Sequence, residues 1–293
     1  MAEVRYLQLD VFAARPGGGN PLAVVIGARS WSAADMQRFA AWTNLVETTF
    51  LLPAQDPRAS YRLRIFTPTR EIPFAGHPTI GSAHAALDAG VVEPHAGRLL
   101  QECAAGLLPI LVEGTGRERR LLVQAPKASV LRRGVDADPQ LTAILGDRRL
   151  GALPPAFVEG GRRWWLAELA DEAQVRGWHP NHAAIAALAH ASDSLGLCVF
   201  TRSTAADHEL VVRAFPAGVG IVEDPASGAA NGLVAAYLAD SEPNGPLGRG
   251  YRVSQGREIG HDASILIRID GPAIWVGGQT QTVIDGRACW PLA

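Results

Sequence analysis

Lysine is almost absent from the sequence. Of the 27 lysines and arginines only one, Lys127, is a lysine, and the others are arginines. Enzymes that form a Schiff base with pyridoxal phosphate or with a carbonyl substrate need a reactive lysine. Lys127 stands beside a proline in "VQAPKASV", a setting more typical of a strand edge than of a catalytic pocket. Both classes of Schiff-base enzyme are therefore disfavoured.

Cysteine is also scarce, and Cys103, Cys198 and Cys289 lie far apart in the chain. They form neither a disulfide framework nor a metal-binding motif. The histidines of "HPNH" (179–182) have no acidic or cysteine partner at the spacing of a metal site. The glycine-rich "RPGGGNP" (15–21) lacks the Lys-Ser/Thr ending of a phosphate loop and reads as a hairpin turn, with Asn20 as a hydrogen-bonding group. We expect neither a metal ion nor a cofactor.

Long apolar runs and an excess of charge are absent as well. No stretch is long enough to span a bilayer, and the net charge of −2 gives no reason to expect nucleic acid or a membrane surface as partner. The opening "MAEVRYLQLDVF" reads as a strand and not as a signal segment. A hydrophobic content of 47% over 293 residues is ample for a packed core. These features favour a cytoplasmic protein.

Two stretches of the sequence follow the same plan. Residues 64–87 and 211–238 each run from a β-rich segment through Phe and Pro into a turn, and each continues as a helix of small residues. The turns carry one ionisable residue before a proline, His77 in the first and Asp224 in the second. These two residues are 147 positions apart, as are Glu47 and Ser194, which are expected to open equivalent strands. The repetition predicts an α+β fold of two pseudo-symmetric lobes.

The expected boundaries follow from this repeat. The first lobe covers residues 1–118 and the second covers residues 119–271. The tail "AIWVGGQTQTVIDGRACW" reads as a strand pair beyond the second repeat, so residues 272–293 are expected to cross back to the first lobe. The segment "RRWWLAEL" (162–169) fits a strand as well as a helix, and its assignment stays open.

A turn that leads into a helix presents unpaired backbone N–H groups, which favour a carboxylate or an oxyanion. If the lobes face each other, His77 and Asp224 would line one cleft, where ligand sites commonly form. Taken alone, each turn also suits a purely structural role, because Asp caps helices and Pro starts them. Glu47, at the start of an apolar strand, taken alone suits a solvated strand end.

The motifs together resemble a known family. "GGGNPLAVV", "NLVETTFLL", "RIFTPTREIPFAGHPTIGSA", "EDPASGAANGLVAAYL", "SQGREIG" and "VGGQTQTVIDG" are similar, in the same order, to segments of the PhzF-like phenazine-biosynthesis family. The resemblance implies a diaminopimelate epimerase-like fold, in which each lobe is a barrel-like sheet around a central helix. It also implies an active site between the lobes.

The resemblance further implies a cofactor-free isomerase of the kind that converts trans-2,3-dihydro-3-hydroxyanthranilate. By this resemblance Glu47 moves the proton, while His77 and Asp224 position and polarise the substrate. The substrate carboxylate is then expected to meet backbone amides of the two turns. The substrate-binding residues are expected to be Asn20, Gly76, Ser227, Gly228 and Ala229.

The sequence departs from the family at two places, and this leaves other functions open. Ala229 stands where the family usually has a serine, and "GHDAS" with His261 and Asp262 stands where the family often has "GRPS". Both departures weaken the inference to the phenazine substrate itself. The alternatives are an amino-acid racemase that works without a cysteine pair and a non-catalytic ligand-binding protein. A homodimer is expected as the commonest soluble assembly.

Overall fold

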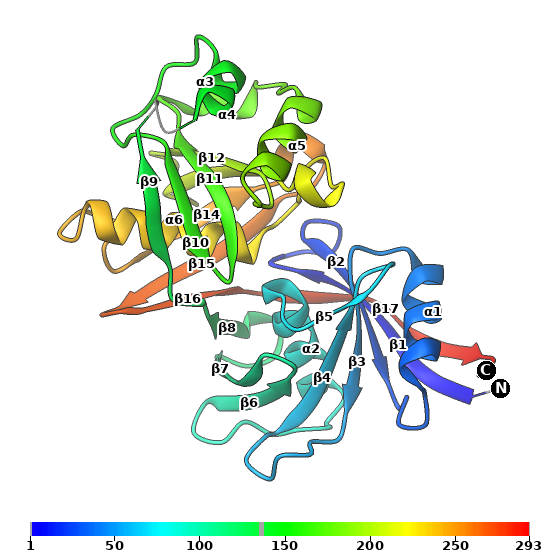
Figure 1. Cartoon of the computed structure of the whole chain (residues 1–293). Helices are drawn as coiled ribbons and strands as arrows, with labels where there is room; N and C mark the ends of the chain where they lie inside the picture. The colour runs from blue at the N-terminus through cyan, green and yellow to red at the C-terminus, as the bar shows by residue number, and fades with distance from the viewer. Residues whose placement is uncertain (1, 135–137, 293) are drawn as a thin grey trace. The chain divides into compact units, whose positions relative to one another are not determined.

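Strands dominate the fold and alternate with a few helices in two units (Figure 1). The computed structural model describes residues 2–134 and 138–292. Unit 1 contains the described residues up to Gln124 and from Gly277 onward, and unit 2 runs from Ala125 to Val276. The mixed α and β content expected from the sequence is confirmed. Within the described residues, no helix combines the length and the apolar character needed to cross a membrane.

Unit 1 is built around a single run of paired strands. Its elements are β1 (Ala2–Val11), β2 (Asn20–Ile26), α1 (Ala33–Thr43), β3 (Thr48–Leu52), β4 (Tyr61–Phe66), β5 (Glu71–Ile72), α2 (Gly76–Asp88), β6 (Arg98–Cys103), β7 (Gly106–Glu113), a short 3-10 turn (Gly116–Glu118), β8 (Arg120–Gln124) and β17 (Thr280–Trp290). The strands pair in the order β8, β7, β6, β4, β3, β2, β1, β17. Only the β2–β3 and β4–β6 pairs in this order are parallel.

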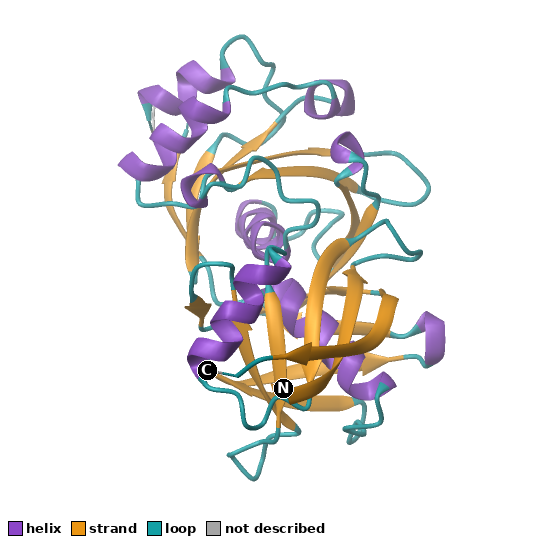
Figure 2. Ribbon diagram, turned by 90° about the vertical axis from the view of Figure 1, so that its right-hand side faces the viewer, coloured by secondary structure: helices purple, strands orange, loops and turns teal. Residues whose placement is uncertain are grey.

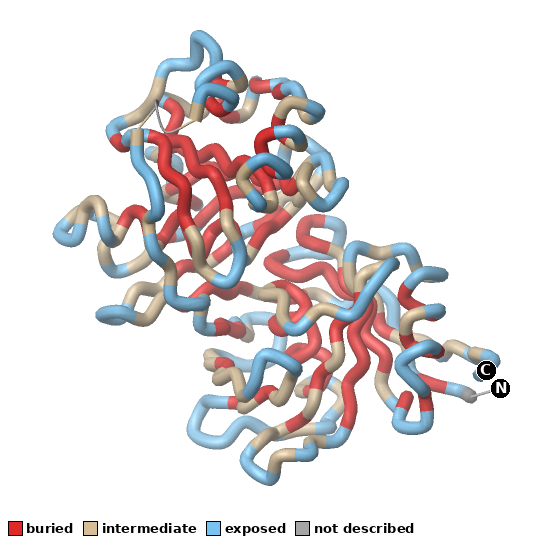
Figure 3. The backbone as a smooth tube through the Cα atoms, in the orientation of Figure 1, coloured by how far each residue is buried: buried red, intermediate tan, exposed pale blue. Residues whose placement is uncertain are grey.

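Helix α2 forms the centre of unit 1. Every residue from His77 to Ala86 is buried, and the helix contacts strands from both halves of the run, among them β1, β2, β3, β4, β8 and β17. Small side chains allow this approach. A Cβ added at Gly81 would lie 2.5 Å from a methyl carbon of Leu22 and 2.7 Å from one of Val11. Figure 3 shows the same pattern, with buried residues along the strands and exposed ones at the loops.

Helix α1 begins at a capping box. Ser32 caps it, because its hydroxyl accepts from the backbone N–H of Asp35 at 3.1 Å while Asp35 accepts from the Ser32 backbone. Its apolar side packs on β3 and β4 through Met36 and Phe39. The C-cap, Asn44, adopts a left-handed conformation (φ 54°) that ends the helix and turns the chain toward β3.

Unit 2 repeats the topology of unit 1. Its elements are β9 (Ser129–Arg133), α3 (Pro139–Leu145), β10 (Ala156–Gly160), β11 (Arg162–Glu168), α4 (Glu172–Arg176), α5 (His182–Ala191), β12 (Leu197–Arg202), β13 (Leu210–Phe215), 3-10 turns (Ala217–Val219 and Arg257–Ile259), α6 (Gly228–Ser241), β14 (Gly250–Gln255), β15 (Ala263–Asp270) and β16 (Ala273–Gly278), whose last two residues belong to unit 1. The ambiguous "RRWWLAEL" segment is strand β11.

The strand pairing is the same in both units. In unit 2 the order, given from the opposite end to that of unit 1, is β9, β10, β11, β12, β13, β14, β15. The parallel pairs β11–β12 and β13–β14 correspond to β2–β3 and β4–β6. Helix α6 takes the place of α2 and packs on β9, β10, β11 and β15. Figure 2 shows one helix of this unit enclosed by strands. Each unit is therefore a curved sheet around a helix.

The structure corrects the equivalences that the 147-residue spacing suggested. Helix α5 and strands β12 and β13 each begin 149 residues after α1, β3 and β4, whereas α6 begins 152 residues after α2. Ser194 accordingly lies three residues before β12, while Glu47 directly precedes β3. The shared spacing of 147 residues therefore does not mark equivalent positions.

The number of residues that separates counterparts in the two units changes from 149 to 152 between β13 and α6. There unit 2 contains the 3-10 turn Ala217–Val219. Asp224 forms a bridge with Ala214, just as Ile72 pairs with Ile65 in unit 1. Asp224 thus occupies the place of Ile72, and the counterpart of His77 is Ala229. The expectation that His77 and Asp224 hold equivalent positions is wrong.

Candidate active site

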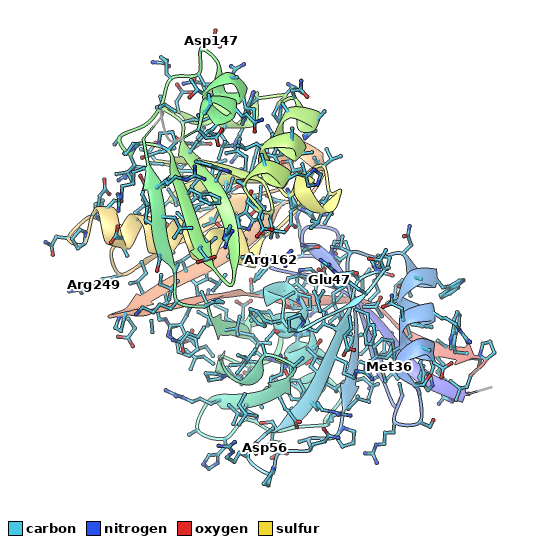
Figure 4. All side chains as sticks on the ribbon, in the orientation of Figure 1. Met36, Glu47, Asp56, Asp147, Arg162 and Arg249 are labelled. Carbon is cyan, nitrogen blue, oxygen red and sulfur yellow. The ribbon has the colours of Figure 1, made fainter. Side chains whose placement is uncertain are left out.

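Glu47 lies between the end of α1 and the start of β3 in unit 1 (Figure 4). Its backbone carbonyl accepts from Ala23 of the neighbouring strand β2 at 3.4 Å, which fixes the main chain there. The side chain is only 12% exposed. A solvated strand end does not describe this residue, because its carboxyl group points into the protein.

His77 is the second residue of α2 and not part of a preceding turn, as the sequence suggested. Pro78 is compatible with a helix that begins at Gly76. In the first turn a backbone N–H has no partner within the helix, so a proline there loses no helical hydrogen bond. This places the buried His77 ring beside Glu47, with Nε2 at 3.4 Å from Glu47 Oε2. The pair joins two segments that lie about thirty residues apart in the sequence.

Burial lowers the pKa of His77 to about 3, and a hydrogen bond to the backbone of Pro21 opposes this shift only in part. Proline has no N–H, so its carbonyl accepts this bond. Since Nε2 makes no hydrogen bond to the protein, the donor is Nδ1. His77 is therefore neutral near pH 7, with its Nε2 lone pair turned toward the carboxyl group of Glu47.

The pair is suited to proton transfer. A separation of 3.4 Å exceeds the distance of about 2.7–2.9 Å that is usual for charge-assisted hydrogen bonds. A neutral imidazole does not hold the neighbouring carboxyl group as a permanent carboxylate, as an arginine would. The ring of His77 is thus not a fixed cation beside the Glu47 carboxyl group.

The start of α2 supplies anion-binding groups next to this pair. The N-cap residue, Ala75, has no side chain that can cap the helix, so no side-chain cap satisfies the backbone N–H groups of Gly76 and His77. The positive end of the helix dipole lies at the same point. Asn20, buried at the start of β2, is the neighbour of the Pro21 that holds the His77 ring.

In unit 2 the predicted residues gather around the start of α6. Asp224 accepts from the backbone N–H of Ala226 at 3.2 Å. Ser227 is the N-cap, and its hydroxyl accepts from Ala230 at 3.3 Å, so this hydroxyl already has a structural role. Gly228 and Ala229 are the first two helical residues, in the places that Gly76 and His77 hold in α2. The predicted site residues therefore form two groups, one in each unit.

Sequence reasoning missed two buried amides in the second group. The side chain of Gln255 donates to the carbonyl of Asp224 at 2.8 Å and accepts from the backbone of Ser227 at 3.2 Å. It also accepts from the side chain of Asn231 at 2.8 Å. Gln255 lies in the segment "SQGREIG", but a single glutamine has no pattern that marks such a role.

The cysteines have no part in either group. Burial raises the pKa of the Cys198 thiol, and the nearby Asp224 raises it further. Burial also raises the pKa of Cys103, and Cys289 is an exposed residue of β17. Thiolate catalysis is therefore disfavoured. Among the residues that the structure describes, no three His, Cys, Asp or Glu side chains cluster in a way that would bind a metal ion.

Known proteins resemble the chain over nearly its whole length. Residues 9–290 match the family described as phenazine biosynthesis-like protein. The "Antisense-enhancing sequence 1" protein of Schizosaccharomyces pombe is 32% identical over 98% of this chain and 99% of its own. The trans-2,3-dihydro-3-hydroxyanthranilate isomerase of Pseudomonas aeruginosa is 35% identical over 97% of this chain and 99% of its own.

The fold is shared with solved structures. A Bacillus anthracis phenazine biosynthesis protein of the PhzF family superposes with a TM-score of 0.84 at 22% identity, over 99% of this chain and 100% of its own. Solved epimerases have the same general fold, which confirms the epimerase-like fold that the sequence predicts. The names of relatives support the expectation of an isomerase. The family match extends over both units, and we conclude that the chain belongs to the phenazine biosynthesis-like (PhzF) family.

Proposed function

We propose that the protein is a cofactor-independent isomerase that moves a proton within a small carboxylated substrate. The observation that carries this proposal is the buried pair of Glu47 and neutral His77, 3.4 Å apart at the uncapped start of α2. Glu47 takes a proton from one carbon and returns it to another, so the enzyme ends in its starting state. The relative from Pseudomonas aeruginosa suggests trans-2,3-dihydro-3-hydroxyanthranilate or a close analogue as substrate.

The substrate carboxylate is proposed to bind backbone N–H groups at a helix start. Gly76 and His77 offer such groups beside Glu47, and Gly228 and Ala229 offer the equivalent groups in unit 2. We propose, on the family resemblance, that Asp224 and Ser227 are also substrate-binding residues. Ala229 offers no hydroxyl, so a substrate that differs from the one named above is compatible with this proposal.

The test follows the proton. The protein is incubated in heavy water with trans-2,3-dihydro-3-hydroxyanthranilate, and the ring is observed by proton NMR. The expected result is an isomerised product that carries deuterium from the solvent, and no such product with Glu47→Gln. Turnover that persists in Glu47→Gln would refute the role of Glu47.

The same assay separates the alternatives. A racemase would exchange the α-proton of both enantiomers of an amino acid and leave the double bonds, and hence the ultraviolet spectrum, unchanged. A non-catalytic protein would bind the carboxylate in calorimetry without any exchange.

We also propose that the protein is a homodimer. Light scattering of the purified protein tests this proposal, and the mass of a single chain, 31.0 kDa, would contradict it.

A further inference from the structure

Gln255 holds the main chain on both sides of the Asp224 turn. It is the last residue of β14, and its side chain is fully buried. The amide nitrogen donates to the carbonyl of Asp224, and the amide oxygen accepts from the backbone N–H of Ser227. One side chain thus fixes both ends of the four-residue segment from Asp224 to Ser227, the N-cap of α6.

Asn231 completes this arrangement from the helix. Its amide nitrogen donates to the Gln255 oxygen at 2.8 Å and to the carbonyl of Ser227 at 2.9 Å. Both side chains are completely buried, where the loss of a hydrogen bond leaves a polar group without water to replace the partner. The bonds of Gln255 and of the Asn231 nitrogen thus hold the turn, while the Asn231 oxygen makes no hydrogen bond to the described residues.

Unit 1 shows that the topology does not require these amides. Tyr61 opens β4 and pairs with Gln101, and Leu210 opens β13 and pairs with Val253. Gln101 and Val253 are therefore counterparts. Cys103 and Gln255, which each lie two residues later, are counterparts as well.

The helices give the second counterpart. Since α2 and α6 begin at Gly76 and Gly228, Asn231 corresponds to Thr79. The same sheet and helix thus form in unit 1 without either amide.

A second interaction provides the contrast. An arginine in β4 or β13 binds a glutamate in the following segment through two hydrogen bonds, Arg64 with Glu71 and Arg213 with Glu223. Because this pair occurs in both units, it belongs to the shared fold. Unit 1, in which Ile72 takes the place of Asp224, has no amide at either corresponding position, and its buried Gln101 bonds Tyr61 and Thr79 instead. We therefore relate the role of Gln255 and Asn231 to the Asp224 turn.

We propose that Gln255 and Asn231 are positioning residues that hold the Asp224 turn, and with it the N–H groups of Gly228 and Ala229, in the form that binds the substrate carboxylate. The inference rests on the proposed function in one respect only, namely that this turn contacts the substrate. Neither amide needs to touch the substrate or the transferred proton.

The test uses Gln255→Met, which keeps the length of the side chain and removes its hydrogen bonds. Asn231→Thr, which installs the residue that unit 1 carries at this position, serves as a second variant should Gln255→Met fail to fold. The matched control is Gln101→Met, which removes a fully buried glutamine that bonds Tyr61 and Thr79 in unit 1. Each folded variant is examined by amide hydrogen exchange and by titration with anthranilate, a simple carboxylate probe, followed by NMR.

The expected result is faster exchange at Ser227, Gly228 and Ala229 in Gln255→Met and Asn231→Thr, with anthranilate bound at least about fivefold more weakly. Gln101→Met is expected to leave both unchanged. With an active substrate, KM should rise in the two variants while the pH dependence of kcat stays that of the wild type. Exchange and binding equal to those of Gln101→Met would overturn the proposal.

The readouts separate this proposal from the isomerase. A wild-type protein that binds anthranilate at Gly228 but isomerises nothing would refute the proposed function, and the exchange comparison would still decide the role of Gln255. The opposite result is also distinguishable. If the wild type isomerises its substrate and Gln255→Met has the same amide exchange, anthranilate binding and KM, only the positioning role of Gln255 is refuted.

Discussion

Arg213 and Glu223 form a buried, two-pronged ion pair next to Asp224. Arg213 Nε and Nη2 lie 2.9 and 2.8 Å from the two Glu223 oxygens, and the side chains are only 6% and 4% exposed. The third nitrogen, Nη1, donates to the carbonyl of Val175 in α4 and to that of Trp178, two residues after the helix. Through Glu223 the position of Asp224 is thus tied to β13 and α4.

Glu223→Gln is expected to destabilise unit 2 strongly. It leaves the guanidinium of Arg213 buried without a counter-charge, and losing one partner of such a pair costs about 3–5 kcal/mol. Glu71→Gln is the matched control, because its pair with Arg64 has the same two-pronged geometry but side chains that are 38% and 23% exposed. A loss of no more than about 1 kcal/mol is expected there. Urea unfolding measures both, and equal losses would contradict the assignment.

The neutral state of His77 makes stability depend on pH. Its pKa is about 3 in the folded protein and 6.5 when unfolded, so between these values only the unfolded chain binds the proton. The stability that neutral His77 contributes is complete above pH 6.5 and is lost as the pH falls toward 3. The expected slope approaches about 1.4 kcal/mol per pH unit within that window.

His77→Gln tests this dependence. Urea unfolding of the wild type and of His77→Gln at pH 7, 5.5 and 4.5 should show a steeper loss in the wild type, since the other titrating groups are common to both proteins. Parallel curves would mean that the ring of His77 takes up its proton as readily in the folded protein as in the unfolded chain.

Ser227→Ala is expected to lower the free energy of unfolding by about 1 kcal/mol, because the N-cap of α6 loses its hydroxyl. Asn181→Ala removes the equivalent cap of α5 and should cost a similar amount. Only Ser227→Ala should also weaken binding of anthranilate, as measured by NMR titration. A matching loss of affinity in Asn181→Ala would indicate a general effect of stability and not a local one.

Gly81→Ala tests how closely α2 packs inside its sheet. In an exposed helix this change stabilises by about 1 kcal/mol, but here the new methyl group would overlap Leu22 and Val11, and we expect a net loss of about 1–3 kcal/mol. Gly286→Ala in β17 is the control, since a Cβ added there would meet no atom within 4 Å and the φ of this glycine is ordinary. Thermal unfolding should separate the two, and a stabilised Gly81→Ala would show that α2 can shift.

Local signals in the sequence predicted much of this fold. Helix α1 is specified by Ser32 and by apolar residues on one face, and both features lie within a dozen residues. The segment of β11 could not be assigned from its pattern, because a strand buried on both faces loses its alternation.

The site was harder to predict. Glu47 alone reads as a surface residue, and only its contact with His77 from another element reveals its burial. The partners of Gln255 lie 24 to 31 residues away in the chain, so no spacing rule finds them. The equal spacing of 147 residues was misleading because two different offsets, 149 and 152, separate the true counterparts.

The pairing of β17 with β1 has a consequence for how the chain folds. Residues 280–290 supply the strand that lies beside residues 2–11, so the sheet of unit 1 stays incomplete until the chain has been made as far as residue 290. Unit 2 draws its strands almost entirely from one continuous segment and has no such requirement. During synthesis unit 2 is therefore able to complete its sheet first, while β1, which can already pair with β2, gains its second partner only when β17 is made.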